Sequence, residues 1–529
     1  MGDVRVDGPN SPLVKSPEEM VGRFQAELIS ALPGWKERLT ANPNQLGELE
    51  REVQSVFDRG AGLLIVGLLA VAMKPPAFDE ACERTRQGFE YPLAAGRMRQ
   101  IRVRLLSGLV MWVTSLYCAP RKSWFGRTDA KFPGAYVELA QFGFGKGCTP
   151  GLQSKVARQA ALCPSLRFAQ QELQRDGVLL DVKAVGRMAR QCGEGLLRLR
   201  LKQLELWREG KLLAGTELAG QRVSVQLDGG RTRIRGDLRD APAVPEVTDA
   251  DGLPCEDAPG RSQKRPRKTF DADWREPKLM TIFVHDAEGR MVKKSRATID
   301  GTFLGPDAAA ELVAMHPHRL GAAQAASITF VADGGVWIWD RIPTIVRLVK
   351  LEGITPHEVL DCYHAVHHIA LALASLGFTE QERMPLYREH RTLLRNGQWR
   401  RVVEELTELA GDTPPDAKVW TEIAYLQKHG EAGRLKYPTF RGLGLPLGSG
   451  AIESGIRRVI NLRLKGNAIY WREENAESML QIRAQVLTNR WNERMDELRQ
   501  LRSRDARTTW RWIPQNMSFK LERDVSSTV

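Results

Sequence analysis

Alternation of apolar and polar residues predicts a strand near the middle of the chain. Val223, Val225 and Leu227 alternate with polar residues that end at Asp228, and two glycines follow. A period of two residues is typical of a β-strand with one buried side. Asp228 is therefore predicted to lie at the end of a strand.

A second strand is predicted by the apolar run 328–332, which is rich in β-branched and aromatic residues and stops at Asp333. Gly334 and Gly335 come next, so this acid has the same local sequence as the first. A carboxylate at the end of a strand points out of the carboxyl edge of a sheet, and adjacent glycines allow a ligand or metal to approach the backbone closely.

The remaining elements of this region predict a mixed sheet with helices on its faces. Strands are expected at 278–284 and 294–299, and a helix at 306–315. The pattern is helical from 343 to 436 with an interruption near 411–415, a helix opens at 448–455, and another runs over 476–497.

The N-terminal third is predicted to be mainly helical. The longest apolar run, 63–73, is about half the length that spans a bilayer, which favours a buried helix. Residues 90–117 are β-rich and predict a small sheet or hairpin. Two helices around Asp176-Gly177 fit either a helix-turn-helix or an ordinary helical hairpin. The second of them carries the basic residues Lys183, Arg187 and Arg190, and 196–207 continues as a basic amphipathic helix.

Composition narrows the class of partner. The chain has 529 residues and a formal net charge of +13, with a pI near 9.5. This charge favours a polyanionic partner such as nucleic acid, and a generally basic surface is the alternative. Seven scattered cysteines form no C-x-x-C pair, so we expect a reducing, cytoplasmic compartment. Residues 143–151 are Gly-rich but lack the ending of a phosphate-binding loop.

A third acid, Glu453, lies near the start of the helix that follows Gly448-Ser-Gly. Two strand-end aspartates and a helix-borne glutamate match a ribonuclease-H-like nuclease core. Phosphodiester cleavage there would need two Mg²⁺ ions held by carboxylate oxygens. Glu473, Glu474 and especially Glu477 are alternative third acids.

Several segments, in order, resemble the DDE transposases of bacterial insertion sequences, in a Mutator-related group with a D-G-x-x-W-I-W motif and a helical insertion. The segments are Gln226-Leu-Asp-Gly-Gly, Trp274-Arg-Glu-Pro-Lys, Ala332-Asp-Gly-Gly-Val-Trp-Ile-Trp, Leu360-Asp-Cys-Tyr-His-Ala, Gly448-Ser-Gly-Ala-Ile-Glu-Ser and Arg463-Leu-Lys-Gly-Asn with Trp471. The resemblance covers about residues 220–490. It departs from the family in lacking a cysteine-paired zinc knuckle, since Cys118 stands alone.

The resemblance implies an α/β ribonuclease-H-like core with an all-helical insertion, after a mainly helical N-terminal DNA-binding region. It implies cleavage at element ends and strand transfer, with Asp228, Asp333 and Glu453 as catalytic ligands of two Mg²⁺ (or Mn²⁺) ions. The partners would be double-stranded DNA, as terminal inverted repeats and target, and a second copy in a homodimer or higher oligomer. The protein would be cytoplasmic, bacterial and nucleoid-associated, with no membrane partner.

Asp361 and His364 match an accessory D-x-x-H element of that family. The residues alone also fit a polar patch with His368 on one helix face, or a zinc site from His364, His367 and His368. Basic and aromatic residues after Glu453 are expected to contact DNA, with Trp471 stacking on a base. They are Arg457, Arg458, Arg463, Lys465, Trp471 and Arg472. A solvated helix face with Trp471 in the core is the alternative.

The expected domain boundaries follow these elements. They are 1–85 (helical), 86–150 (β-containing), 151–220 (helical, DNA-binding), 221–345 (N-terminal segment of the core, with a flexible insertion at 237–268), 346–445 (helical insertion), 446–500 (C-terminal segment of the core) and 501–529 (tail). Two alternative functions stay open: a domesticated, non-catalytic DNA-binding regulator, and a ribonuclease-H-like nuclease that only hydrolyses.

Overall fold

The structure is a computed structural model that describes residues 3–87, 93–120, 134–145, 147–236, 272–351, 353–466 and 469–504. Its contacts divide the chain into two compact units. The first contains Met1–Lys211 and Gln481–Ile513, and the second Leu212–Leu480 and Pro514–Val529. The insertion predicted at 237–268 and the residues of the predicted tail from 505 onwards lie outside the described residues.

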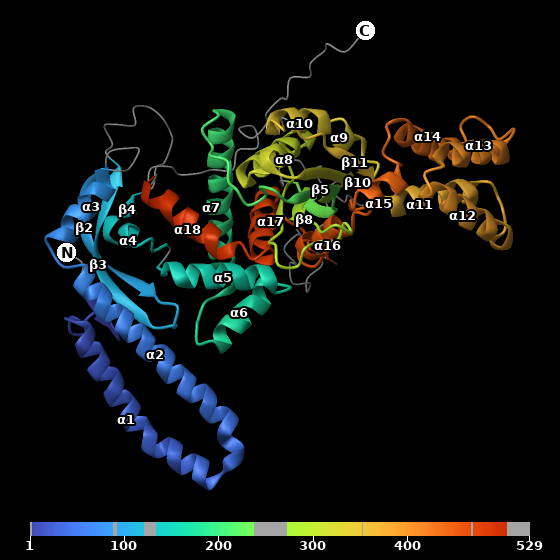
Figure 1. The fold of residues 1–529 in the computed structure, drawn as a ribbon. Helices are drawn as coiled ribbons and strands as arrows, with labels where there is room; N and C mark the ends of the chain where they lie inside the picture. Colours follow the sequence, from blue (N-terminus) through green and yellow to red (C-terminus); the bar gives the residue numbers. More distant parts are fainter. Residues whose placement is uncertain are drawn as a thin grey trace, which may run out of the picture. The chain divides into compact units, whose positions relative to one another are not determined.

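The first unit is mainly helical around a small antiparallel sheet in the order β1-β3-β2, with β4 paired to β3. This agrees with the predicted helices and the β-rich segment after them (Figure 1). Its elements are β1 (Val4–Val6), α1 (Pro17–Ala41), α2 (Leu46–Ala72), α3 (Ala77–Gln87), β2 (Leu93–Arg104), β3 (Val110–Pro120), β4 (Ala135–Tyr136), α4 (Val137–Gln141), α5 (Pro150–Leu162), α6 (Leu166–Arg175), α7 (Val182–Arg208) and α18 (Trp491–Arg504).

The apolar run 63–73 is not a short separate helix but the second half of the 27-residue α2. Leu63, Val66 and Ala70 are buried in the core of the first unit. The side chains on the other side of the helix, Leu64 and Leu68 among them, are exposed. Among the described residues, 43–72 is the one helical stretch whose length and composition alone would allow it to cross a membrane.

The two helices expected around Asp176-Gly177 are α6 and α7, and Gly177 has the positive φ of 74° that this sharp connection requires. α7 is one continuous helix of 27 residues, so the basic amphipathic continuation expected at 196–207 is confirmed as its second half. Lys183, Arg187 and Arg190 are exposed on its first turns. DNA binding by these residues stays a prediction.

The second unit contains a mixed five-stranded sheet in the order β11-β10-β5-β8-β9. β10 is parallel to both β5 and β11, whereas β8 is antiparallel to β5 and β9. The strands are β5 (Arg222–Gly229), β8 (Lys278–Val284), β9 (Thr298–Thr302), β10 (Ser327–Ala332) and β11 (His357–Leu360). Three were predicted closely, but β9 begins four residues later than the start expected, because 294–295 form a turn.

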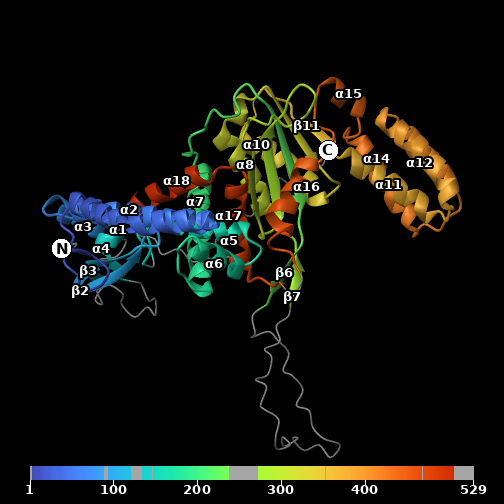
Figure 2. The same ribbon diagram turned by 90° about the horizontal axis from the view of Figure 1, so that it is seen from below.

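Helices pack on this sheet and extend beyond it (Figures 1 and 2). α8 (Pro306–Leu320) packs on β8 and β9, and α16 (Gly450–Ile456) packs on β5 and β8. The predicted helical insertion lies between β11 and α16 and consists of α11 (Cys362–Ser375), α12 (Glu380–Arg395), α13 (Trp399–Ala410), α14 (Lys418–Glu431) and α15 (Tyr437–Gly442). The second unit is thus a mixed α/β domain with additional helices.

Three features differ from the predicted elements. The region 343–436 is not purely helical, because the short strand β11 follows α9 (Val336–Trp339) and α10 (Ile342–Val349). A two-stranded ribbon of β6 (Thr232–Arg235) and β7 (Ala272–Arg275) was not predicted. The helix expected at 476–497 is divided into α17 (Glu473–Leu487) and α18 at Asn489, whose φ of 56° is left-handed and breaks the helix.

Gln226 fixes the start of α16 to the sheet. Its buried side-chain amide donates to the carbonyl oxygen of Gly448 (3.1 Å) and accepts from the backbone N–H of Ile452 (3.0 Å). Gly455 then packs directly on Thr281 and Leu279 of β8, where a side chain would find little room. The start of α16, and with it Glu453, is therefore held at a defined position beside β5.

We predict that Gln226→Ala lowers the free energy of unfolding of the second unit by about 2–4 kcal/mol. Both the Gly448 carbonyl and the Ile452 N–H would lose their partner in a buried place. Urea unfolding followed by circular dichroism measures this change. Gln427→Ala is the matched control, since the Gln427 amide bonds only at the exposed surface of α14. Equal effects of the two substitutions would contradict the role of Gln226.

Candidate functional site

The carboxyl ends of three parallel strands meet at one edge of the sheet, and an aspartate stands at each end. Leu227 of β5 and Leu360 of β11 are both in register with Ala332 of β10. The next residues along the three chains are Asp228, Asp333 and Asp361. Since neighbouring strands lie about 4.8 Å apart, the three acids form one row along this edge. We call these three residues the acid row.

Asp361 is the most firmly held acid of the row. It begins α11 and accepts hydrogen bonds from the backbone N–H groups of Tyr363 (2.6 Å) and His364 (3.0 Å). Its other oxygen accepts from the backbone N–H and the hydroxyl of Ser449, just before α16. Burial would raise the pKa of Asp361, but hydrogen bonds from His364 and Ser449 lower it to about 2. Asp361 is therefore a buried, permanently charged carboxylate.

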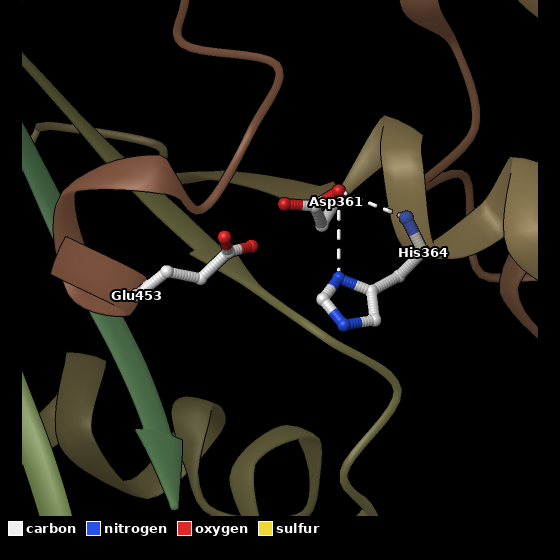
Figure 3. Close-up of side chains that lie close together, drawn as sticks. All are labelled: Asp361, His364 and Glu453. Atoms are coloured by element: carbon white, nitrogen blue, oxygen red, sulfur yellow. Dashed lines mark hydrogen bonds and ion pairs between the residues drawn. The ribbon is translucent and has the colours of Figure 1, made fainter. Parts of the chain in front are cut away.

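Ser449, which contacts Asp361, also holds Glu453 beside the acid row. The Ser449 hydroxyl that contacts Asp361 also lies 2.9 Å from Oε1 of Glu453. A serine hydroxyl has one proton and donates to one carboxylate at a time. Glu453 is exposed, so its carboxylate keeps lone pairs that a cation can use. Figure 3 shows Glu453 and Asp361 approaching each other from α16 and the end of β11, with His364 beside them.

His364 supplies a positive charge to this group. Its Nδ1 lies 3.6 Å from an oxygen of Asp361. The contact with Asp361 raises the pKa of His364 to about 9 against the opposing effect of burial, and the charges of Asp333 and Glu453 act in the same direction. At neutral pH the metal-free protein therefore carries an imidazolium beside the acids.

Asp228 responds to the same neighbours in the opposite way. Burial, followed by the charge of Asp333, raises the pKa of Asp228 to about 7, and Glu453 adds to this, while the N–H of Gly229 and the charge of His364 oppose it. Asp333 and Glu453 thus lie close enough to Asp228 for their charges to raise its pKa. Without a cation, Asp228 is about half protonated at neutral pH.

Asp361, His364 and Glu453 could hold a metal ion, because one ligand atom from each lies within 4.8 Å of the others. The hydrogen bonds of these three residues show which of them has lone pairs left for a metal. Four donors already fill the roughly four lone-pair directions of the Asp361 carboxylate. A protonated imidazole cannot ligate either. The carboxylates with lone pairs to offer are those of Glu453, Asp333 and Asp228.

The two glycine pairs do not open onto a ligand, contrary to our expectation. A Cβ at Gly334 would lie 1.9 Å from the ring of Tyr425, and one at Gly229 would lie 1.9 Å from the carboxylate of Glu276. A Cβ at Gly230 would lie 2.5 Å from Ile460. Close approach is required as predicted, but side chains of the protein itself make it.

Tyr425 therefore brings α14 of the helical insertion to the acid row. Its hydroxyl is buried. Burial, together with the charges of Asp333 and Asp361, raises the pKa of Tyr425 above its ordinary value. The phenol stays neutral and offers a proton donor beside two acids. No pattern in the sequence marked this residue, since its partner Gly334 lies about ninety positions away.

The predicted zinc site of three histidines does not form in the described structure. His364 is turned to Asp361, whereas Nδ1 of His368 contacts Glu422 of α14 at 2.5 Å and its ring stacks on Tyr425. His367 is exposed. The polar patch proposed for Asp361, His364 and His368 is divided as well, because His364 contacts Asp361 and His368 contacts Glu422.

Glu477 is engaged with a different strand from the acids. It is fully buried and accepts a hydrogen bond from the backbone N–H of Phe303 at 2.7 Å, directly after β9, which is two strands from β5. Glu473 and Glu474 are in the first turn of α17, and burial raises the pKa of Glu473. Glu453 is the glutamate that the structure places with the aspartates.

The predicted DNA-binding residues after Glu453 divide into two groups. Arg457, Arg458, Lys465 and Arg472 are exposed. Arg463 is buried, and its guanidinium lies 5.0 Å from the ring centroid of Trp471, which is only partly exposed. Trp471 is therefore poorly placed to stack on a base as predicted, because Arg463 covers it.

We predict that Gly334→Ala destabilises the second unit by about 1–3 kcal/mol, because its methyl group would collide with the Tyr425 ring. In the Tyr425→Ala background the same substitution should cost almost nothing, since the ring is gone. A double-mutant cycle measured by urea unfolding gives this coupling energy. Gly442→Ala is the control, because open space surrounds that glycine. Additive effects of the two changes would contradict the contact.

We predict that Asp228 and His364 stabilise the metal-free protein progressively less as pH rises from about 4 to about 9. The folded-state pKa values of Asp228 (about 7) and His364 (about 9) exceed their ordinary values of 3.8 and 6.5. Each group therefore stabilises the folded state below its ordinary pKa, and this contribution is lost as pH rises through the folded value. Asp228→Asn should flatten the lower part of the profile and His364→Gln the upper part, in urea unfolding with EDTA.

Mg²⁺ binding should follow the same groups, because a ligand has to lose its proton first. We expect the affinity for Mg²⁺ to rise by up to about tenfold per pH unit below pH 7, where Asp228 holds a proton. Titration calorimetry in buffers of different ionisation enthalpy would detect the released proton. Binding without proton release at pH 6 would exclude Asp228 as a ligand.

Comparison with protein-family models, with curated proteins and with solved structures gives no match. The functional interpretation of this site therefore depends on its own geometry and chemistry. Those are a row of strand-end aspartates, a glutamate from a neighbouring helix and a charged histidine.

Proposed function

We propose that this protein is a metal-dependent DDE transposase that cleaves DNA at element ends and joins them to target DNA. One observation carries the proposal: β5 and β10 pair in parallel register up to Leu227 and Ala332, the next residues are Asp228 and Asp333, and the charge of Glu453 on α16 acts on Asp228. These are the three acids that the resemblance names. The mixed sheet with its acids at one edge, interrupted by a helical insertion before the glutamate, supports the ribonuclease-H-like core that the resemblance implies.

The donor set suits two Mg²⁺ ions. All three side chains offer carboxylate oxygens, the ligands that hard cations prefer. Asp228 is raised in pKa by its neighbours and gains from a cation that relieves this repulsion. When bound, such ions lower the pKa of an attacking water or 3′-hydroxyl and stabilise the leaving oxygen. Asp228 and Asp333, which come from adjacent strands, would share the site, and Glu453 would complete it.

Asp361 and His364 act on this site without ligating metal. Asp361 fixes the turn at Ser449 and thereby positions Glu453. It also orients the imidazolium of His364 toward the acids. A charged imidazole beside the carboxylates would contact a phosphate oxygen of the substrate and hold it near the acids. Tyr425 would donate its phenolic proton in the same place.

The charge of the chain agrees with a DNA substrate. Its formal net charge is +13, and exposed Arg457 and Arg458 lie in η4 (Arg457–Asn461), directly after the helix that carries Glu453. Cations near a nuclease site neutralise phosphates and fix the register of the duplex. Assembly of two copies on paired DNA ends belongs to the same proposal.

We predict that Asp333→Asn lowers both end cleavage and strand transfer by about a thousandfold or more, since it removes a charged ligand worth several kcal/mol in the transition state. DNA binding should change little, because the cations that contact phosphates remain. Labelled oligonucleotide ends, uncut and pre-cleaved, incubated with Mg²⁺ and a plasmid target measure the two steps separately.

Asp412→Asn provides the matched control, because Asp412 lies in the exposed turn after α13. Cleavage that survives Asp333→Asn would contradict the metal-site assignment. Cleavage without joining of pre-cleaved ends by the native protein would favour the nuclease that only hydrolyses. Binding of DNA without either activity or Mg²⁺ affinity would favour the non-catalytic regulator.

A further inference from the structure

Three short segments of the second unit form a small sheet beside the acid row. β6 pairs antiparallel with β7, with Arg233 opposite Trp274. Residues 469–472 join on the other side of β6, since Trp471 exchanges backbone hydrogen bonds with Arg233 (3.1 Å) and Arg235 (2.9 Å). We call residues 232–235, 272–275 and 469–472 the aromatic–arginine ribbon. Figure 2 shows β6 and β7 side by side.

The two sides of the ribbon differ in chemistry because side chains alternate along each strand. Thr232 and Ile234 are buried, and Trp471 is paired with Ile234, so these residues belong to the inner side. The outer side therefore carries Arg233 with an aromatic residue on each neighbouring segment. The Arg233 guanidinium lies 4.8 Å from the ring centroid of Trp274 and 5.8 Å from that of Tyr470.

Both outer aromatic rings are open to solvent. Trp274 is 48% exposed and Tyr470 is 38% exposed. Large aromatic residues are usually buried, so two exposed rings on one small surface indicate a binding role. Arg233 sits between them, and the Lys465 ammonium lies 6.0 Å from the Trp274 ring centroid on the same side.

The ribbon is also strongly basic. The three segments contain four arginines and one carboxylate: Arg233, Arg235, Arg275, Arg472 and Asp273. Asp273 and Arg275 both neighbour Trp274 and so point to the other side of the strand. Arg233, Arg235 and Arg472 remain on the outer side. The outer surface therefore combines cations with exposed ring faces. That combination suits a ligand that has both phosphates and flat, unpaired bases, as single-stranded nucleic acid does.

A duplex suits the ribbon less well. In double-stranded DNA the faces of the bases are stacked on one another and cannot contact Trp274 or Tyr470. Phosphorylated peptides and lipid headgroups offer the anion but no base-like plane. The aromatic rings would then stay exposed, and only the arginines would contribute.

The ribbon begins at the acid row. β6 starts four residues after Asp228, and the backbone N–H of Gly230 donates to the carbonyl oxygen of Pro277 at 2.9 Å, which holds its base at the end of β5. A strand lying on the ribbon therefore leads directly to the site of cleavage.

We propose that the aromatic–arginine ribbon binds unpaired nucleotides of the DNA strand that is cleaved at the acid row, with bases stacked on Trp274 and Tyr470. This inference rests on the proposed function for the identity of the polymer as DNA. It adds a requirement that the proposed function does not contain: local opening of the duplex next to the cleaved phosphodiester.

The test is fluorescence anisotropy of the full-length protein with a labelled 20-nucleotide DNA, single-stranded or as a duplex, in EDTA so that no cleavage occurs. Trp274→Leu and Tyr470→Leu keep apolar surface but remove the ring faces, and each should weaken single-strand binding by about tenfold. Trp274→Phe and Tyr470→Phe should retain most of it. Duplex affinity should change less than threefold in all four variants.

Charge is tested separately. Arg235→Gln with Arg472→Gln should reduce the salt dependence of single-strand binding, by about 1.4 in the slope of log affinity against log salt for two lost contacts. Arg388→Gln with Arg391→Gln on the exposed surface of α12 is the matched control and should leave the slope unchanged.

Unchanged single-strand binding in the leucine variants would overturn the proposal, as would an equal loss for single strand and duplex, which would reveal a general anion surface. Tighter binding of the corresponding RNA 20-mer would overturn the choice of DNA. Failure of the proposed function would give a different result, because Asp333→Asn would then retain cleavage. Single-strand binding by Asp333→Asn should equal that of the native protein whether or not the proposed function is correct.

Discussion

Mutual repulsion between carboxylates is the constraint on which the second unit depends. Parallel pairing in register forces the acids at the ends of β5, β10 and β11 into neighbouring positions. Each acid meets this constraint differently. Hydrogen-bond donors stabilise the charge of Asp361, Asp228 retains a proton near neutral pH, and His364 contributes a positive charge. The fold therefore tolerates the acid row without a metal while leaving the carboxylates that a cation needs.

The helical insertion is integral to this arrangement and not merely an addition to it. It begins at Asp361, the acid at the end of β11, and Tyr425 of α14 packs against Gly334. Arg434, after α14, pairs with Glu358 of β11 at 2.8 Å and lies 4.1 Å from the ring centroid of Trp339. The insertion is thus fixed to β11 and to the segment that follows β10, so a change in its position would move Asp333 and Asp361.

The sequence predicted those features of the fold that local pattern determines. Alternation in β5 and the apolar run of β10 are strong signals, and both placed an aspartate at a strand end. β11 has four residues and no such pattern, so Asp361 was assigned to a helix face. The glycines were correctly linked to close approach, but the approaching side chains come from distant positions. Likewise Trp471 and Trp274 differ only in which side of the ribbon they occupy, and that depends on long-range strand pairing.

A cluster of carboxylates attracts metal ions but repels DNA, so the attraction for the substrate has to come from elsewhere in the same unit. Where β8 pairs with the end of β5, the buried Lys278 ammonium lies 2.7 Å from Glu276 and 5.1 Å from the Trp337 ring centroid, so its charge is already paired. The arginines of the ribbon are the cations that remain for a phosphate. Because electrostatic forces between exposed charges decay over about 10 Å in dilute salt, cations this near the acid row can offset its repulsion of a phosphate. In the proposed function, the placement of β6 directly after Asp228 joins binding and cleavage in one stretch of chain.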